Sequence, residues 1–505
     1  MSRLSYKTLE NLPPAVARPS YDPRVTTAGI VHLGVGAFHR AHQAVYLDDL
    51  LARDPQWAIA GASLRRADMR DALAPQDNLY TVAIRSGEAT RLRVIGSLKM
   101  ILVAPEDPEA LLAALCDPAI RIVSLTVTEK GYCHDPATGD LDPDHPDITA
   151  DLDAPMRPTS APGLLAESLR RRRAAGIVPF TVMPCDNLPE NGPTAHRIVT
   201  QYAALRDGGL AGFIERDVAF AGTMVDRIVP ATSEDDITQI SAALGVADAW
   251  PVATEPFSQW VIEDRFPTGR PDFASVGAEM VTDVEPYERM KLRMLNGAHS
   301  TLAYLGYLAG YETVSETMAD PAYERLVRDL MTDEVMPTLE MPGTDLAAYR
   351  DALIARFHNP ALQHRTWQIA MDGSQKLPQR LLGTIRHRLA RGEAVDRLAL
   401  GVAAWMRYAT GIDETGAPID VKDPLAGRLR AIGDEAGRDP AKLAAAYLGV
   451  EAVFGRDLSD HPEFVRAVTA ALASLFQRGA AATVAAMMRP STFPIAASSP
   501  RRPDP

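Results

Sequence analysis

The first strand-to-helix turn of the chain reads IVHLGVGAFH over residues 30–39. A short apolar run ends there, and residues 40–51 continue with a helical pattern. Two glycines let the chain turn tightly and bring backbone N–H groups close to a pyrophosphate. The third glycine of the dinucleotide-binding pattern GxGxxG is replaced by His39, and many strand-to-helix turns contain two glycines. The residues of this turn that we expect to contact a dinucleotide are Gly34, Gly36, Ala37 and Phe38.

Strand-like and helix-like segments alternate around this turn. Apolar and β-branched runs predict strands at residues 30–33, 57–63, 121–127 and 180–183, and residues 108–116 carry a helical pattern. Such alternation predicts an α/β fold, with a parallel sheet covered by helices on both faces. Ligands of such folds gather at the carboxyl ends of the strands. The first half of the chain is therefore predicted to be a Rossmann-like dinucleotide-binding domain.

The pattern changes near residue 285, beyond which helical runs dominate. Long helices are predicted over residues 286–308, 323–335 and 462–478. We therefore expect a Rossmann-type domain over residues 1–284 and a mainly helical substrate or catalytic domain over residues 285–490. The segment 491–505 is rich in Pro, Ser and Arg, and we expect a flexible tail there.

The end of the second predicted strand should read the adenosine ribose. The sequence there is LRRAD over residues 64–68. An acid at this point favours the free 2′-hydroxyl of NAD, whereas an arginine accepts the 2′-phosphate of NADP. Asp68 therefore favours NAD, while Arg65 and Arg66 leave NADP open. A solvated charged loop is the alternative interpretation.

Composition and charge exclude several classes of protein. The 505 residues carry a net charge of -13, which disfavours a nucleic-acid binder, because phosphate contacts need clustered basic residues. The three cysteines form no CxxC pair or zinc-ligand spacing, so we expect no metal and a reducing, cytoplasmic setting. The first residues lack the apolar stretch of a signal peptide, and no apolar run is long enough to span a bilayer. The sequence predicts no particular oligomeric state.

A second informative stretch reads MKLRMLNGAH over residues 290–299. With about 100° per residue in a helix, Asn296 lies about 140° from Lys291, and His299 about 80°, so all three can face one cleft. Burial can lower the pKa of a lysine until it serves as a general base, and Asn and His can donate to an oxyanion. The alternative is a surface lysine, a capping asparagine and a packed histidine.

Four blocks in order along the chain resemble the polyol-specific long-chain dehydrogenases, the mannitol 2-dehydrogenase family. They are GVGAFHRAH (34–42), CDNLP (185–189), MVDRIVP (224–230) and the Lys291, Asn296 and His299 pattern. The resemblance implies that Lys291 is the general base and that Asn187 and Asn296 stabilise an oxyanion. It also implies that His299 orients substrate hydroxyls, that Asp226 lies near the nicotinamide and the substrate, and that no metal is required.

Two further blocks resemble the fructuronate reductase (D-mannonate oxidoreductase) subfamily. They are SLTVTEKGYC (124–133) and TWQIAMDGSQKLPQR (366–380). Mannitol dehydrogenases typically have Gly where this chain has Lys130 and Arg where it has Gln368. Because mannonate and fructuronate carry a carboxylate, an added cation would favour them through charge-assisted hydrogen bonds. The candidate cations are Lys130, Lys376, Arg365 and Arg380, and the alternative for Lys130 is a side chain that points to solvent.

These patterns lead to one favoured function and three rivals. We expect the NAD-dependent, reversible reduction of D-fructuronate to D-mannonate, which belongs to hexuronate catabolism. The first rival is a dehydrogenase of mannitol, arabinitol or another neutral sugar alcohol, and the second acts on a different aldonate. A non-catalytic dinucleotide-binding protein is the third. The expected partner is a small sugar acid or sugar alcohol, with neither nucleic acid nor membrane.

Overall fold

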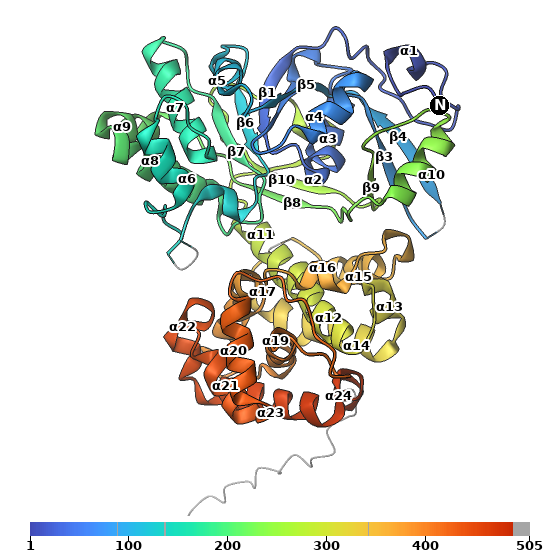
Figure 1. Cartoon of the computed structure of the whole chain (residues 1–505), viewed down its shortest axis with the longest axis vertical. Coiled ribbons are helices and arrows are strands. Elements are labelled where there is room, and N and C mark those ends of the chain that lie inside the picture. Colours follow the sequence, from blue (N-terminus) through green and yellow to red (C-terminus); the bar gives the residue numbers. More distant parts are fainter. Residues whose placement is uncertain (88, 136–137, 342, 488–505) are drawn as a thin grey trace, which may run out of the picture. The chain divides into compact units, whose positions relative to one another are not determined.

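The computed structural model describes residues 1–87, 89–135, 138–341 and 343–487 (Figure 1). The chain forms two compact units. The first contains Met1–Leu295, Leu339–Asp345 and Asn359–His364, and the second contains Asn296–Thr338, Leu346–His358 and the chain from Arg365 onward. The tail expected over residues 491–505 lies outside the described residues.

A five-stranded parallel sheet forms the centre of the first unit, as the alternating pattern predicted. Its strand order is β5-β2-β1-β6-β7, and every neighbouring pair is parallel. The chain order reverses beside β1, so the carboxyl ends of β1 and β6 border the crevice where such folds bind ligands. The strands are β1 (Ala28–Leu33), β2 (Ala58–Ser63), β5 (Leu98–Val103), β6 (Ile122–Leu125) and β7 (Thr181–Pro184).

Alternate residues of these strands enter two separate cores. Val31 and Leu33 pack in the core that contains α5 (Pro108–Cys116), α7 (Ala161–Ala174) and α8 (Asn191–Arg206). Ile30, between Gly29 and Val31, points the other way and packs with residues of α3 (Gln43–Leu50). This period of two is what a strand buried on both faces requires. Further helices of this unit are α1 (Tyr6–Leu9), α4 (Asp68–Leu73), α6 (Pro146–Asp153), α9 (Gly208–Asp217) and α10 (Glu234–Leu244).

The helix expected over residues 40–51 is two helices, so that prediction was wrong. α2 (Ala37–Ala41) and α3 are separated by His42, whose φ of -123° and ψ of -90° lie outside the helical region. His42 is fully buried, its Nε2 lies 2.8 Å from the carbonyl oxygen of Gln259, and its ring stacks on Phe38. These contacts to a distant strand outweigh the local helical pattern.

Two three-stranded sheets complete the first unit, and the sequence analysis predicted neither. One has the order β11-β10-β8 and the other β4-β3-β9. Helix α11 (Glu285–Lys291) contacts β8, so the strand that ends at Asp226 lies beside the helix that ends at Lys291. The strands are β3 (Tyr80–Arg85), β4 (Thr90–Ile95), β8 (Thr223–Asp226), β9 (Val252–Thr254), β10 (Gln259–Glu263) and β11 (Glu279–Val281).

The second unit is helical, and its described residues contain isolated β-bridges but no longer strand. Its buried centre is α19 (Asp396–Ala409), which packs against α12 (Gly297–Leu308) and α23 (Pro462–Arg478). Among the described residues, no helix is both long and apolar enough to cross a membrane. The remaining α-helices are α13 (Val314–Ala319), α14 (Pro321–Asp329), α15 (Leu346–Phe357), α16 (Thr366–Ala370), α17 (Gly373–Leu377), α18 (Gly383–Leu389), α20 (Ala426–Ala436), α21 (Pro440–Leu448), α22 (Glu451–Ser459) and α24 (Ala480–Met487).

The helix expected over residues 286–308 is interrupted, which corrects the angles derived above. Between α11 and α12, the segment η5 (Leu292–Asn296) is π-helical. Its hydrogen bonds run from i to i+5, so each turn holds more residues than an α-turn. The 140° angle between Lys291 and Asn296 assumed an unbroken α-helix and does not hold. Such π-helical insertions occur frequently at functional sites.

Candidate functional site

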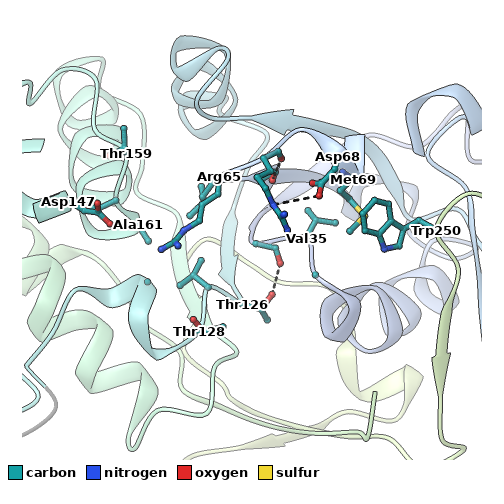
Figure 2. A pocket seen from close by; sticks show the side chains of 18 residues that line it. Val35, Arg65, Asp68, Met69, Thr126, Thr128, Asp147, Thr159, Ala161 and Trp250 are labelled. Atoms are coloured by element: carbon teal, nitrogen blue, oxygen red, sulfur yellow. Dashed lines mark hydrogen bonds and ion pairs between the residues drawn. The ribbon is translucent and has the colours of Figure 1, made fainter. Parts of the chain in front are cut away.

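A cavity of about 660 Å³ opens at the carboxyl ends of β1, β2 and β6 in the first unit (Figure 2). Four of the residues predicted to bind a dinucleotide line it, whereas Ala37 and Phe38 are not among its lining residues. The cavity lies where the strand order predicts a ligand, so it is the candidate cofactor site. The four predicted residues are Gly34, Gly36, Arg66 and Asp68.

The conformation of Gly34 explains why the turn needs a glycine. Its φ is +96°, and a Cβ atom there would lie 2.2 Å from the carbonyl oxygen of Thr126. The hydroxyl of Thr126 donates to the Gly34 carbonyl at 2.7 Å and lies 2.8 Å from Nε2 of His32. Because the Thr126 hydroxyl donates its only proton to Gly34, it can only accept from His32. His32 therefore donates from Nε2 and accepts from the Ser124 hydroxyl at Nδ1. Burial lowers the pKa of His32 to about 3, so the imidazole that joins Thr126 to Ser124 stays neutral.

The ribose-reading segment carries both a carboxylate and cations. Arg66 and Asp68 lie 3.6 Å apart, and both side chains are exposed. In Figure 2 the Arg65 side chain extends toward the Asp147 side of the cavity, away from Asp68. Asp68 and Arg66 therefore share one part of the cavity and Arg65 lies in another, which fits both the NAD and the NADP alternative.

The predicted general base lies at the end of α11. Lys291 is 5% exposed, and its ammonium group donates a hydrogen bond to the side-chain oxygen of Asn187. Asn187 is exposed in the loop that follows β7. The interaction brings together two of the four residues assigned to catalysis, although 104 positions separate them in sequence. An amide oxygen accepts from an ammonium group without adding a charge, so it orients the lysine and leaves its proton transferable.

A buried carboxyl group that the sequence analysis missed lies next to Lys291. Glu288 is 7% exposed, and its side chain accepts a hydrogen bond from the Glu190 N–H at 2.9 Å. Burial raises the pKa of Glu288 to about 8, although the nearby charge of Lys291 acts to lower it. The sequence did hold a signal for Glu288: it precedes Lys291 by three residues, and residues three apart share a helix face.

Asp226 lies at the end of β8, the strand that contacts the helix of Lys291. It is 2% exposed and is the last residue of this buried strand. His42 lies within electrostatic reach of both Asp226 and Lys291, and burial lowers the pKa of His42 to about 3. A neutral imidazole, a carboxylate and the predicted base therefore share one region of the first unit.

Asp186, directly before Asn187, is a second group that the sequence analysis did not assign. It is 8% exposed and lies two residues after the end of β7. Burial raises the pKa of Asp186 to about 7, while hydrogen bonds from Tyr132 and from the backbone of Val127 and Thr128 act to lower it. Such a perturbed carboxyl group, one residue before the amide that binds the candidate base, is typical of functional sites.

Several of the other predicted site residues belong to the second unit. Asn296 and His299 are 7% and 8% exposed, and His299 stacks on Phe357 with ring centroids 5.3 Å apart. Helix α12 packs against α16, which carries half-buried Gln368, and the Lys376 ammonium lies 3.3 Å from the Ile369 carbonyl oxygen. These helices thus bring several predicted side chains into one part of that unit.

The candidate cations for a substrate carboxylate differ in their surroundings. Arg365 is ion-paired with Glu312, and Arg380 donates to the Ser300 hydroxyl at 3.0 Å. Lys130 is exposed on the turn η3 (Glu129–Tyr132), next to the cofactor cavity wall at Gly131. The pairing of Arg365 disfavours it as a carboxylate ligand, because Glu312 already neutralises its charge.

One side-chain cluster of the described chain has the composition of a metal site. Ligand atoms of Cys133, His145 and Asp147 lie within 4.8 Å of one another. Burial raises the pKa of the Cys133 thiol to about 12, and Nδ1 of His145 accepts the Asp147 N–H at 3.2 Å. The hydrogen bond occupies one of the two ring nitrogens of His145, and the cluster supplies three protein ligands, one fewer than the four of a structural zinc site.

Two family models together span most of the chain. The mannitol dehydrogenase Rossmann domain matches residues 28–275, and the mannitol dehydrogenase C-terminal domain matches residues 283–476. The first match contains the cofactor cavity and the Asn187 loop. The second begins just before α11.

Individual relatives agree with the family models. The D-mannonate oxidoreductase of Escherichia coli (strain K12) is 52% identical over 94% of this chain and 99% of its own length. The uncharacterized oxidoreductase YdfI of the same strain is 51% identical over 92% of this chain and 96% of its own. Among solved structures, the Pseudomonas fluorescens mannitol 2-dehydrogenase in ternary complex with NAD and D-mannitol matches with a TM-score of 0.90. It is 41% identical over 96% of this chain and 99% of that chain.

Proposed function

Since the chain belongs to the mannitol dehydrogenase family, we propose that it catalyses the NAD-dependent, reversible reduction of D-fructuronate to D-mannonate. The observation that carries the proposal is the hydrogen bond from Lys291 to Asn187, which gives an oxidoreductase of this family a positioned base. The choice of sugar acid rests on the 52% identity to a D-mannonate oxidoreductase. The cofactor is supported by the cavity at β1 and by the related structure that contains NAD.

The proposed reaction divides between the cofactor and the protein. NAD, when bound in the cavity at Gly34 and Gly36, would supply the hydride acceptor for oxidation of the C5 alcohol of D-mannonate to a ketone. Lys291 takes the hydroxyl proton in this direction and returns it in the reverse direction. Asn187 holds the lysine through its side-chain oxygen, and we propose that its amide nitrogen donates to the reacting oxygen. The roles that the family resemblance implies for Asn296, His299 and Asp226 remain predictions.

The substrate carboxylate separates the proposed reaction from that of a neutral sugar alcohol. Lys130 stands on the turn after β6, at the edge of the cofactor cavity, and is the candidate cation that the first unit offers. A charge-assisted hydrogen bond from an ammonium group would offset the desolvation of the carboxylate. The three free thiols of the chain fit a reducing compartment, and we infer a cytoplasmic location for this activity.

A neutral polyol is the second candidate substrate. Two observations favour it: the structural match to a mannitol 2-dehydrogenase and the exposure of Lys130. An exposed lysine binds a carboxylate only if the bound sugar reaches it. A polyol dehydrogenase would use the same base and cofactor cavity.

The deciding assay follows reduction of NAD by absorbance, with D-mannonate and D-mannitol as alternative substrates at matched concentrations. We expect a kcat/KM for D-mannonate at least ~10-fold higher, which corresponds to one charge-assisted contact. A preference for D-mannitol would overturn the proposed substrate and leave the assignment of the base intact. Repeating the assay with NADP tests whether Arg65 and Arg66 outweigh Asp68.

A further inference from the structure

The segment that links β6 to η3 forms one wall of the cofactor cavity and also carries Lys130. Thr126, Val127 and Thr128 line the cavity in succession, and Lys130 follows two residues later. The segment lies between a strand and a short 3-10 turn, so little regular secondary structure holds it. Its shape therefore depends on side chains from elsewhere in the fold.

Thr128 has a backbone conformation that almost only glycine adopts. Its φ is +64° and its ψ is 166°. A residue with a branched side chain stays there only when its surroundings hold it, and such residues cluster at ligand sites. Something must therefore hold this cavity wall in its strained form.

The carboxylate of Asp186 holds this segment at three points. Its Oδ1 accepts the N–H of Thr128 at 2.8 Å, and its Oδ2 accepts the N–H of Val127 at 3.1 Å. Oδ2 also accepts the hydroxyl of Tyr132, at the far end of η3, at 2.9 Å. Two of these donors precede Lys130 in the sequence and one follows it. One carboxylate therefore fixes both ends of the turn that carries Lys130.

The backbone of Asp186 is fixed to the catalytic side of the unit. Asn191 donates from Nδ2 to the carbonyl oxygens of Asp186 and Thr223, at 3.1 and 2.7 Å. Thr223 begins β8, the strand that ends at Asp226. Asn187, the next residue after Asp186, accepts the hydrogen bond from Lys291. Asp186 thus contacts the cavity wall through its side chain, while its backbone belongs to the loop whose Asn187 binds the base Lys291.

We propose that Asp186 is a positioning residue that holds the strained wall at Thr128 and aligns the cofactor cavity and Lys130 with the Asn187–Lys291 pair. The inference rests on the proposed function for its cofactor and its base. Asp186 itself need not touch the cofactor or the substrate. Its effect is transmitted through the two N–H groups and the hydroxyl that it accepts.

The variant Asp186→Asn tests this role, because an amide nitrogen faces donors where a carboxylate oxygen accepted them. We expect the dissociation constant of NADH, followed by fluorescence, to rise ~10-fold or more, the usual scale for a lost buried acceptor. We also expect the KM of the preferred alcohol to rise. Tyr132→Phe removes only the hydroxyl contact, and we expect a smaller change in the same direction. That variant serves as the test if Asp186→Asn does not fold.

A second substitution separates positioning from general loss of structure. Thr128→Gly removes the backbone strain that the carboxylate opposes, so it should restore NADH binding in the Asp186→Asn background to within ~3-fold of wild type. Asp48→Asn is the matched control. Asp48 is also buried and accepts from a tyrosine hydroxyl and a backbone N–H, of Tyr21 and Gly96, and it is in addition ion-paired with Arg93; neither it nor these partners lines the cavity. It should lower Tm without changing the affinity for NADH.

Each outcome decides the inference. Unchanged NADH binding and KM in Asp186→Asn would overturn it, and so would a double variant that binds no better than the single one. NADH binding needs no alcohol, and KM is measured with whichever of D-mannonate and D-mannitol the wild-type enzyme oxidises faster, so an error in the proposed substrate does not affect these comparisons. Failure of the wild-type protein to bind NADH would contradict the proposed function itself.

Discussion

Lys291 donates its hydrogen bond to Asn187 across 104 positions of sequence, from the end of α11 to the loop after β7. The lysine is buried and the asparagine exposed, so the pair joins the interior of the first unit to its surface. A base at such a position can exchange a proton with a bound alcohol and remain oriented by a neutral amide. This arrangement is the chemical centre of the proposed dehydrogenase.

Removal of the amide should impair turnover more than binding. In Asn187→Ala, Lys291 loses its acceptor and the developing oxyanion loses a donor, so kcat should fall ~10²-fold. NADH binding should stay near the wild-type value, because Asn187 does not line the cofactor cavity. Stopped-flow or steady-state assays with D-mannonate and fluorescence titration with NADH measure the two quantities. Wild-type kcat in this variant would remove Asn187 from the mechanism.

Asn187→Asp provides a charge-based companion to that experiment. A carboxylate in place of the amide stabilises the protonated lysine and raises its pKa. The rising limb of kcat/KM for alcohol oxidation should therefore move to higher pH. An unmoved pH profile would show that the group titrating in the assay is not Lys291.

Glu288 should make the stability of the protein depend on pH. Its pKa is about 8 in the folded state, against an ordinary value of 4.5. Between these values the folded state holds a proton that the unfolded state has released, so the free energy of unfolding falls as pH rises through this window. Glu288→Gln removes this fall in the free energy of unfolding with rising pH. The Tm of the variant relative to wild type should increase by ~2 °C or more from pH 5 to pH 9, and a constant difference would contradict the buried carboxyl.

The affinity for NADH should weaken in acid through Asp186. Its pKa of about 7 means that protonation below neutral pH removes an acceptor from the cavity wall. Its titratable and charged neighbours are Glu129, Tyr132 and Cys185, and burial also raises the pKa values of the tyrosine and the thiol. The dissociation constant of NADH in wild type should therefore rise as pH falls from 8 to 6. The same titration in Asp186→Asn should lack this component, and parallel curves would assign it to another group.

Lys130 should discriminate between a sugar acid and a sugar alcohol. Lys130→Ala removes a cation that the carboxylate alone needs, so KM for D-mannonate should rise ~10-fold while KM for D-mannitol changes little. Lys7→Ala is the matched control, because Lys7 is an exposed lysine of α1 outside the cofactor cavity. Equal changes for both substrates would place Lys130 outside the carboxylate site.

Much of the fold was predictable because its signals are local. The strand that ends at Leu33, the helix over Pro108–Cys116 and the helix over Pro462–Arg478 follow directly from apolar periodicity. The break at His42 was not predictable, since it depends on a hydrogen bond to Gln259 far along the chain. The π-helical turn at residues 292–296 was also missed, because an inserted residue leaves the apolar pattern nearly unchanged.

The candidate site shows the same division between local and distant signals. Lys291, Asn187 and Gly34 lie in short blocks whose residue types indicate their chemistry. Asp186 stands in one of those blocks, yet its role depends on donors at Val127, Thr128 and Tyr132, which lie more than 50 positions away. Nothing in the periodicity of a sequence reports such a contact. The strain at Thr128 is likewise a property of the folded chain alone.

The most direct test of the account is the turnover of Lys291→Ala with D-mannonate and NAD, measured beside NADH binding by the same protein. Loss of the general base should lower kcat ~10²–10⁴-fold, while the dissociation constant of NADH stays within ~2-fold of wild type. That result would establish Lys291 as the proton-transfer group of a dehydrogenase with an intact cofactor cavity. Near-normal turnover with normal NADH binding would contradict the central claim.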